Sequence, residues 1–313
     1  MSETARRATI RIGIDLGGTK IEVIALDRAG QERFRKRVPT SVGDYTGTVR
    51  AIATLIKAAS QETETLQGGT KPSVGVGIPG TISPATGLIK GANSVCLIGH
   101  ALDRDIESAI GQPVRLANDA DCFTLSEAAD GAGRDGAIVF GVILGTGVGG
   151  GMVIDKKIMR GPNAITGEWG HNPLPWPSVD ASETPGRACY CGQRGCIETF
   201  LSGPGLSADF EAATSEKIAA PDIVERAARG DAPANAALDR YTQRLARSLA
   251  TVINLLDPSV IVLGGGLSNI DRLYRDVSPL LPEYVFSDTV VTPIVPPKHG
   301  DSSGVRGAAW LWP

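Results

Sequence analysis

The stretch IRIGIDLGGTKIEVIAL, residues 10–26, sets the turn Gly-Gly-Thr-Lys between two apolar segments. Ile10–Asp15 alternates in a way that fits a strand, and Ile21–Leu26 is predicted as a second strand, so the stretch predicts a hairpin closed by a glycine-rich turn. The segments that follow are predicted as a strand near Glu32–Val38, a helix over Tyr45–Ser60, a polar loop over Gln61–Pro72 and a strand over Val74–Ile78.

The same pattern starts again in the second half of the chain. After VRLAN, from Val114, the sequence predicts a helix through DADCFTLSEAA, a strand over Ala137–Leu144, a turn GTGVGGG and a strand over Gly151–Ile154. We infer an internal repeat of structure, although the two sequences do not align well. The longest helical pattern covers residues 232–257 and ends at Asp257-Pro258, because a residue before proline disfavours the α region. The strand VIVLGGG then runs into a glycine turn.

Length and charge limit the class of protein. The 313 residues suffice for two domains, and the net charge of -3 gives no general attraction to nucleic acid or anionic membranes. Partners are therefore expected to be small molecules or copies of the chain. The N-terminal residues show no signal-peptide core, and no apolar run reaches membrane-spanning length. We expect a cytoplasmic protein.

The turn in GIDLGGTK differs from a phosphate-binding P-loop. Gly13 and Gly18 have the P-loop spacing, but Thr19 precedes Lys20 and a strand follows where a helix is required. We expect the hairpin turn itself to cradle phosphate through the amides of Gly17 and Gly18, the Thr19 hydroxyl and Lys20, although an ordinary β-turn explains a single such hairpin equally well. Asp15, at the strand end, is expected to hold Mg²⁺ through water.

Two further glycine clusters extend the nucleotide hypothesis. Gly145, Thr146 and Gly147 repeat the same turn chemistry, so two facing turns could clamp a triphosphate between two lobes. Gly264, Gly265 and Gly266 follow a buried strand and would let a flat ring such as adenine approach the backbone. A tight strand-to-helix turn is an equally good explanation of this last cluster.

The pair Asn118-Asp119 lies where a strand gives way to a helix. Asp119 is either a plain N-cap or a general base, since phosphoryl transfer to an alcohol needs a carboxylate that accepts the hydroxyl proton.

The stretch CYCGQRGC predicts a metal centre. Cys189, Cys191 and Cys196 lie within eight residues, and with His171 upstream they make a tetrahedral zinc set. Buried thiols and a disulfide are the alternatives, but an odd count of five cysteines and no secretory signal favour a reducing compartment. Glu168 and Glu198 flank the four predicted zinc ligands in the sequence. A zinc ion with a purely structural role would not need these two carboxylates.

Taken together, IGIDLGGTK, GIPG, Asn93, LANDADC, GTGVGGG, GEWGH, CYCGQRGCIE and VIVLGGG resemble the ROK family of sugar kinases and repressors from end to end. The resemblance implies a two-lobed α/β fold of the actin-like, hexokinase-like ATPase (ribonuclease H-like) type with a zinc-binding loop. The small N-terminal lobe is expected to comprise residues 1–117 and 298–313, and the larger lobe, with the zinc site, residues 118–297. ATP, with Mg²⁺, and sugar would meet in the cleft between the lobes.

The resemblance also implies residue roles. The family base that takes the proton from the sugar hydroxyl matches Asp119. The positions that hydrogen-bond sugar hydroxyls match Asn93, Asn118, Glu168, His171 and Glu198, while the cysteines and His171 match zinc ligands. A homodimer is expected by family analogy alone.

The family's repressors carry a DNA-binding domain ahead of the sugar-binding part, and the first strand here starts near Thr9, so no such domain is expected. A sugar-sensing protein without catalysis is the alternative from another functional class.

The segment HNPLPWP, the 18-residue interval from His171 to Cys189 and the tail HGDSSGVRGAAWLWP look most like bacterial fructokinases that also accept mannose. We therefore expect D-fructose to be phosphorylated at its 6-hydroxyl, possible further substrates being mannose and glucose. The alternative is an N-acetylglucosamine or N-acetylmannosamine kinase. Asp121 stands where many relatives have Asn, and it either perturbs Asp119 or faces solvent.

Overall fold

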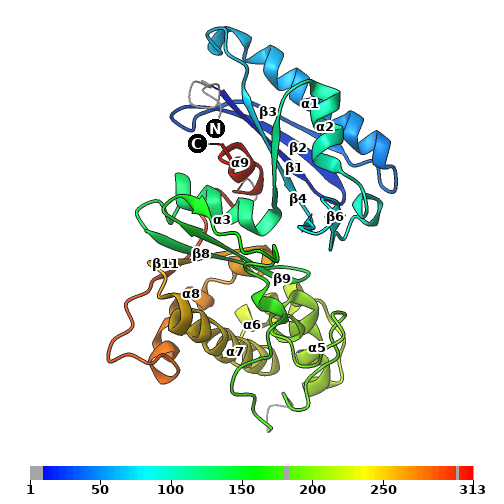
Figure 1. The fold of residues 1–313 in the computed structure, drawn as a ribbon. Helices are drawn as coiled ribbons and strands as arrows, with labels where there is room; N and C mark the ends of the chain where they lie inside the picture. Colours follow the sequence, from blue (N-terminus) through cyan, green and yellow to red (C-terminus); the bar gives the residue numbers. More distant parts are fainter. Residues whose placement is uncertain (1–9, 180–182, 301–302, 313) are drawn as a thin grey trace. The chain divides into compact units, whose positions relative to one another are not determined.

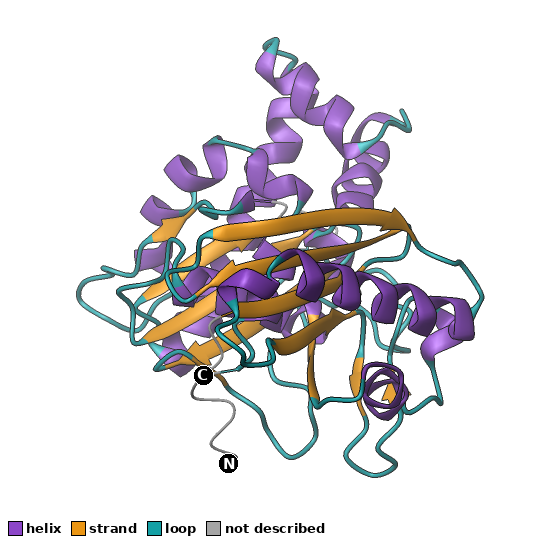
Figure 2. Ribbon diagram, turned by 90° about the horizontal axis from the view of Figure 1, so that it is seen from above, coloured by secondary structure: helices purple, strands orange, loops and turns teal. Residues whose placement is uncertain are grey.

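The computed structural model describes residues 10–179, 183–300 and 303–312 (Figure 1). Over this range the protein contains both helices and strands (Figure 2). The strands are β1 (Ile10–Leu16), β2 (Lys20–Asp27), β3 (Glu32–Pro39), β4 (Ser73–Ile78), β5 (Thr81–Ile82), β6 (Ile89–Lys90), β7 (Val114–Asn118), β8 (Ile138–Leu144), β9 (Val148–Ile154), β10 (Lys157–Ile158), β11 (Val260–Gly264) and β12 (Ile294–Val295).

The α-helices are α1 (Tyr45–Glu62), α2 (Leu102–Ile110), α3 (Asp119–Ala129), α4 (Glu198–Leu201), α5 (Gly203–Thr214), α6 (Ala220–Ala228), α7 (Ala232–Leu256), α8 (Arg272–Asp276) and α9 (Ser303–Ala309). Short 3₁₀ helices are η2 (Glu64–Leu66), η3 (Val95–Leu97), η4 (Trp169–His171), η5 (Gly266–Asn269) and η6 (Ser278–Glu283). None of the helices within the described ranges is both long enough and apolar enough to cross a membrane.

The two large sheets have the same strand order. The first is β3-β2-β1-β4-β7 and the second is β10-β9-β8-β11-β12. In each sheet the central strand pairs antiparallel with the strand that follows it in sequence and parallel with a later strand, as β1 does with β2 and β4, and β8 with β9 and β11. The internal repeat expected from the two hairpins is confirmed by this matching order.

The glycine-rich turn after β8 is shorter than the sequence predicts. GTGVGGG was expected to be a turn as far as Gly151, but β9 begins at Val148 and its glycines pair in register with β8. The reason is close packing, because a Cβ on Gly150 would lie 2.8 Å from Cδ1 of Trp169. Likewise the expected loop over residues 61–72 contains the end of α1 and the short helix η2.

Helix α7 has capping residues at both ends. The Asp231 side chain accepts a hydrogen bond from the Ala234 amide at 2.9 Å and starts the helix. Asp257 ends it with a left-handed φ of 44°, directly before Pro258, as the Asp-Pro pair predicts.

Contacts divide the chain into two compact units. The first comprises residues 1–134, 156–166 and 298–313, and the second comprises residues 135–155 and 167–297. The expected small lobe ended at residue 117, whereas α3 groups with the first unit because it packs on α9 and continues from β7.

In the first unit, helices cover both faces of the sheet. Helix α1 contacts β1 and β2 and packs on α2, while α9 lies on the other face beside α3 (Figure 1). Glycines allow α9 to lie directly on the strands, because a Cβ on Gly13 would lie 2.1 Å from Val305 O and one on Gly75 would lie 1.9 Å from Ala308 O. The core strands therefore hold the carboxyl ends of β1, β4 and β7 in fixed positions.

In the second unit, the core joins β8, β9 and β11 to the apolar side of α7. Phe140 and Val142 of β8 belong to the same buried cluster as Tyr241, Leu245 and Leu249 of α7. Helices α5 and α6 pack against α7 in turn.

Candidate active site and metal centre

The parallel strands of the first sheet bring several predicted site residues to one edge. The carboxyl ends of parallel strands meet at the same edge of a sheet, so Asp15 of β1, Gly80 after β4 and Asn118 of β7 share that edge. The Asn118 Nδ2 atom donates to the Gly80 carbonyl at 3.1 Å. A Cβ on Gly80 would lie 2.8 Å from the Ala92 amide, so the chain passes this point just before Asn93. Asn93 itself is exposed.

The hairpin turn between β1 and β2 is tied at its base and open at its tip. The Gly17 amide donates to the Lys20 carbonyl at 3.0 Å, and the Thr40 hydroxyl donates to the Gly17 carbonyl at 2.8 Å. Gly18, Thr19 and Lys20 are exposed, and a Cβ on Gly18 would meet no atom within 4 Å. The turn therefore presents exposed backbone and side-chain donors of the kind that bind phosphate.

The carboxyl group of Asp15 has a raised pKa. Burial and the nearby charges of Asp119 and Glu22 raise its pKa to about 6, against the opposing effects of Lys20 and Arg37. A carboxylate that burial and a neighbouring carboxylate both disfavour gains from a cation that offsets the negative charge. Asp15 thus fits the Mg²⁺ role predicted for it.

Asn118, and not Asp119, is the N-cap of α3. Asn118 has extended backbone angles (φ -63°, ψ 154°), and its side-chain oxygen accepts a hydrogen bond from the Ala120 amide at 2.9 Å. The plain reading of Asp119 as the cap is therefore wrong. Asp119 occupies the first helical position, with Oδ1 also 2.9 Å from the Ala120 amide, and its side chain remains accessible.

The surroundings of Asp119 suit a base. Although the residue reaches the surface, the protein atoms around its carboxyl desolvate that group and raise its pKa above the ordinary value, while the Ala120 amide and the Asn118 side chain oppose the rise. A general base works best when its pKa lies closer to the operating pH than that of a solvated carboxylate. Asp121, two residues on, is half-buried and does not simply face solvent.

In the second unit, two predicted nucleotide segments lie together. Strands β8 and β11 are parallel neighbours, so the turn at Gly145 and the glycines after Leu263 leave the sheet at one edge. A Cβ on Gly265 would lie 2.4 Å from Leu144 O, and the φ of Gly265 is +81°. Only glycine combines this approach with this backbone angle. The cluster Gly264–Gly266 is therefore a tight strand-to-helix turn beside Gly145, and it leads into η5.

Four side chains form a metal-ligand set. The donor atoms of His171, Cys189, Cys191 and Cys196 all lie within 4.8 Å of one another. The Cys191 and Cys196 sulfurs are 3.6 Å apart, and the Cys189 sulfur is 3.6 Å from His171 Nδ1. A tetrahedral zinc with sulfur ligands at about 2.3 Å separates two sulfurs by about 3.8 Å. These residues therefore fit zinc, with His171 binding through Nδ1.

The chemistry of the thiols points the same way. The sulfur separation excludes a disulfide between Cys191 and Cys196, because a bonded pair lies at about 2.05 Å. Burial and the neighbouring thiols raise the pKa of Cys196 to about 12. A cation is needed to hold three thiolates so close together.

Backbone hydrogen bonds fix the loop that carries these ligands. The Leu174 amide donates to the Gly195 carbonyl at 2.8 Å, and the Ile197 amide donates to the Asn172 carbonyl at 2.9 Å. The segment after His171 is thus held against the segment around Cys196.

The flanking glutamates connect the metal set to the second hairpin. Glu198 Oε2 accepts a hydrogen bond from the Val148 amide at 2.9 Å, next to Gly147. Glu168 is exposed at the start of η4, and the following Trp169 donates to the Gly149 carbonyl at 2.9 Å. The second unit therefore gathers the predicted sugar-binding carboxylates, the metal set and the second glycine turn in one region.

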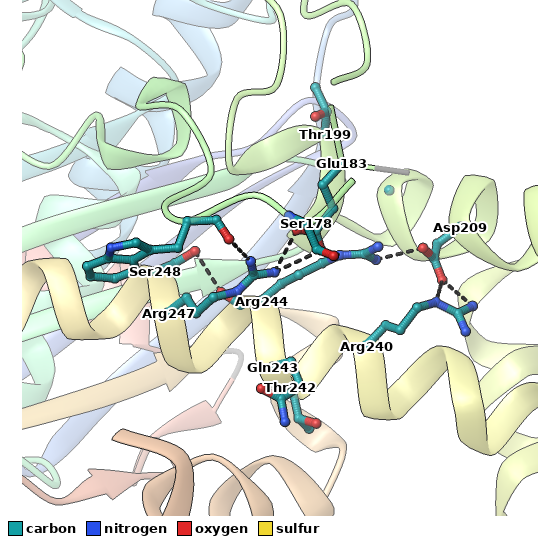
Figure 3. Close-up of polar contacts among 12 residues, drawn as sticks. Ser178, Glu183, Thr199, Asp209, Arg240, Thr242, Gln243, Arg244, Arg247 and Ser248 are labelled. Atoms are coloured by element: carbon teal, nitrogen blue, oxygen red, sulfur yellow. Dashed lines mark hydrogen bonds and ion pairs between the residues drawn. The ribbon is translucent and has the colours of Figure 1, made fainter. Parts of the chain in front are cut away.

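A buried ionic network supports this region (Figure 3). Glu183, in the loop between His171 and Cys189, binds Arg244 Nε at 2.7 Å and Arg247 at 2.8 and 2.9 Å. Arg244 continues to Asp209 at 2.7 Å. These side chains are all at most 8% exposed. The network ties the metal-binding loop to α5 and α7.

Arg187 adds a second tie close to the cysteines. Its guanidinium donates to the carbonyls of Thr199 and Gly205, each at 2.8 Å. The loop is therefore fixed to α4 and α5 within two residues of Cys189.

Comparison with known proteins places the chain in a family. Residues 11–313 match the ROK family. The chain belongs to the ROK family. An N-acetyl-D-glucosamine kinase of Yersinia enterocolitica is 38% identical over 301 residues, which cover 96% of this chain and 98% of that protein.

Solved ROK structures share the fold. A ROK hexokinase from Thermus thermophilus superposes with a TM-score of 0.84 at 27% identity, covering 97% of each chain. A ROK family glucokinase from Streptomyces griseus, in complex with glucose and AMPPNP, gives a TM-score of 0.75 at 27% identity, covering 97% of this chain and 99% of that one. The expected hexokinase-like α/β fold is confirmed.

Two features of this ROK chain were not predicted from its sequence. The first is the ionic network, although arginines at 240, 244 and 247 recur at helical spacing within the apolar pattern of α7 and could have signalled buried acidic partners. The second is Tyr190, whose hydroxyl lies 3.0 Å from His171 Nε2. Its position between Cys189 and Cys191 is the sequence signal that could have placed it beside the metal ligands.

Proposed function

We propose that this ROK protein transfers the γ-phosphoryl group of ATP to a hydroxyl of a hexose, with N-acetyl-D-glucosamine as the preferred sugar and the 6-hydroxyl as the acceptor. The choice of sugar is supported by the kinase of Yersinia enterocolitica, 38% identical over 96% of this chain, whose name states that substrate. The fructose preference expected from HNPLPWP has weaker support, and fructose becomes the second candidate.

The observation that carries the proposal is the carboxylate pair at the edge of the first sheet. Asp119 is exposed at the start of α3 and has a raised pKa, and its negative charge contributes to the raised pKa of Asp15. In the proposed reaction Asp119 accepts the proton of the sugar hydroxyl as that oxygen attacks the γ-phosphorus. Phosphoryl transfer needs little else from the protein beyond alignment and charge neutralisation.

The nucleotide would be held by backbone groups. We assign the phosphates to the exposed turn at Gly17, Gly18, Thr19 and Lys20 and to the turn at Gly145, Thr146 and Gly147, with Gly264, Gly265 and Gly266 next to the adenine. Mg²⁺, when bound, neutralises phosphate charge, and Asp15 is the residue proposed to hold it through water. The open tip of the first turn supports this assignment.

The sugar would be held by Asn93, Asn118, Glu168, Glu198 and His171. Asn118 already uses both ends of its amide, on Gly80 and Ala120, so its contribution is to orient the start of α3 as much as to bind sugar. Glu198 has Oε2 on the Val148 amide, while within the described residues Oε1 has no hydrogen-bond partner and is available to a hydroxyl. Zinc, when bound, fixes the loop from which His171 and Glu198 extend.

A coupled ADP-release assay tests the proposal over N-acetylglucosamine, N-acetylmannosamine, glucose, mannose and fructose. We expect the highest kcat/KM for N-acetylglucosamine. A higher value for fructose would overturn the sugar assignment and restore the second candidate. Absence of ADP release with all five sugars, in zinc-replete protein that still binds one of them, would indicate a sugar sensor.

A further inference from the structure

Glu22 is a buried carboxylate of β2 that the proposed reaction does not use. The residue is 1% exposed, so a ligand cannot reach it directly. Its Oε1 accepts a hydrogen bond from Arg35 Nε at 2.5 Å, and its Oε2 accepts one from Arg37 Nε at 2.7 Å. A carboxylate is retained in such a place when it is paired. Glu22 therefore holds two guanidinium groups of β3 in defined positions.

The register of the first sheet places one of these arginines near the glycine-rich turn. Asp15 of β1 pairs with Glu22, and Glu22 pairs with Arg37 of β3. Paired residues project to the same face of a sheet, and so do residues two apart in one strand. Asp15, Lys20, Glu22 and Arg37 therefore share one face beside the turn. The opposing effect of Arg37 on the raised pKa of Asp15 agrees with this placement.

The end of β3 is also tied to the turn itself. The Thr40 amide donates to the Thr19 carbonyl at 3.0 Å, and the Thr40 hydroxyl donates to the Gly17 carbonyl at 2.8 Å. Arg37 lies three residues before Thr40, and its side chain is 45% exposed. A guanidinium has several N–H donors and the bond to Glu22 uses one of them, so the ion pair is compatible with a contact to an anion. These bonds fix Arg37 close to the turn that is proposed to hold phosphate.

We propose that Arg37 binds the phosphate groups of ATP together with Lys20, and that the ion pair with Glu22 holds its guanidinium in place for this contact. The inference rests on the proposed function and deepens it, because it adds a second cation to the phosphate site at the first turn. Arginine suits this role, since its planar guanidinium stays charged and matches the spacing of phosphate oxygens. A guanidinium that is fixed before ATP arrives also loses little conformational entropy on binding.

The test is Arg37→Gln in full-length, zinc-replete protein, with ATP varied at saturating N-acetylglucosamine. We expect kcat/KM for ATP to fall about tenfold or more, because a hydrogen bond between two charged groups is among the stronger ones. KM for N-acetylglucosamine should stay within about twofold of wild type. An unchanged kcat/KM for ATP would overturn the inference.

Arg35→Gln is the matched control. Arg35 binds the same carboxylate but pairs with Ile24, two residues further along the strand from the turn, a distance of about 7 Å. This change also removes an ion pair with Glu22, yet kcat/KM for ATP should stay within about twofold of wild type. An equal fall in both variants would trace the effect to the loss of that ion pair and would overturn a contact between Arg37 and phosphate.

Calorimetric titration distinguishes a direct contact from an effect through the Mg²⁺ proposed at Asp15. Arg37→Gln should weaken the binding of magnesium-free ATP, measured without chelator so that zinc is retained, about as much as it weakens the binding of ATP with Mg²⁺. The Kd for adenosine, which has no phosphate, should stay unchanged. A loss of affinity seen only with Mg²⁺, or an equal loss for adenosine, would overturn the inference.

The same titration separates a failure of this inference from a failure of the proposed function. If wild-type protein binds ATP but phosphorylates none of the five sugars, the kinase assignment fails while the Arg37 contact is still measured by the change in Kd for ATP. If wild-type protein does not bind ATP, both assignments fail.

Discussion

Replacing Glu183 by Gln perturbs the buried network that supports the metal-binding loop. Glu183 is 4% exposed and binds two arginines that are themselves buried (Figure 3). Removing one partner of a buried ion pair costs about 3–5 kcal/mol, because the remaining charge loses its compensation. Arg244 keeps Asp209 at 2.7 Å, so the lower end of that range applies, about 3 kcal/mol.

The effect should be visible in thermal unfolding at pH 7. For a unit of about 150 residues, about 3 kcal/mol corresponds to a fall in Tm of about 6–12 °C. Burial raises the pKa of Glu183, but hydrogen bonds from the Ser178 amide, Arg244 and Arg247 outweigh it and lower the pKa overall. A lowered pKa contributes stability above the pKa of the unfolded chain, and that stability is lost as the pH falls through the folded-state pKa. The difference from wild type should therefore shrink below about pH 4.5.

Glu216→Gln is the matched control, since Glu216 also pairs with an arginine, Arg226, but on the surface. It should change Tm little, because exposed pairs are screened by water and salt. A Tm for Glu183→Gln equal to that of Glu216→Gln would contradict a stabilising role for the buried network. It would mean that the two buried arginines are solvated or paired in some other way.

Three further changes test the roles of Asp15, zinc and Gly265. Asp15→Asn should raise the free energy of unfolding at pH 7 by about 1–2 kcal/mol and abolish activity, because a carboxyl group with a pKa raised to about 6 destabilises the fold once it is ionised. Denaturant unfolding should show this gain disappearing below about pH 4. Removing zinc with a chelator should raise the KM for sugar about tenfold or more before kcat falls, because the metal shapes the sugar-binding loop without touching phosphate. Kinetics measured at different residual zinc contents would show this. A parallel loss of kcat at constant KM would contradict it. Gly265→Ala should cost about 1–3 kcal/mol in thermal unfolding, because its Cβ would lie 2.4 Å from Leu144 O at a φ of +81°, and a neutral result would exclude the close approach.

Local patterns in the sequence were sufficient for much of the fold. The hairpin at residues 10–26 and the end of α7 at Asp257 follow from periodicity and from proline sterics, which act over a few residues. The metal set could be predicted because three of its four ligands lie within eight residues.

Contacts between distant residues could not be predicted in this way. Glu183 and Arg244 are 61 positions apart, and Glu198 meets Val148 across 50 positions, so neither pair has a local signature. The glycines of β9 were misassigned to a turn for a related reason, because Trp169, which requires the space above Gly150, follows 19 residues later in the sequence. Asn118 and Asp119 are both good caps, and only the backbone angles of the folded chain show which one is used.

We propose that Asp119 takes the proton of a sugar hydroxyl during phosphoryl transfer from ATP. The most direct test compares ADP release by wild-type and Asp119→Asn proteins with saturating N-acetylglucosamine, together with calorimetric sugar binding. We predict a loss in kcat of about 100-fold or more, with sugar affinity within a few-fold of wild type. Near-normal turnover by Asp119→Asn would contradict it.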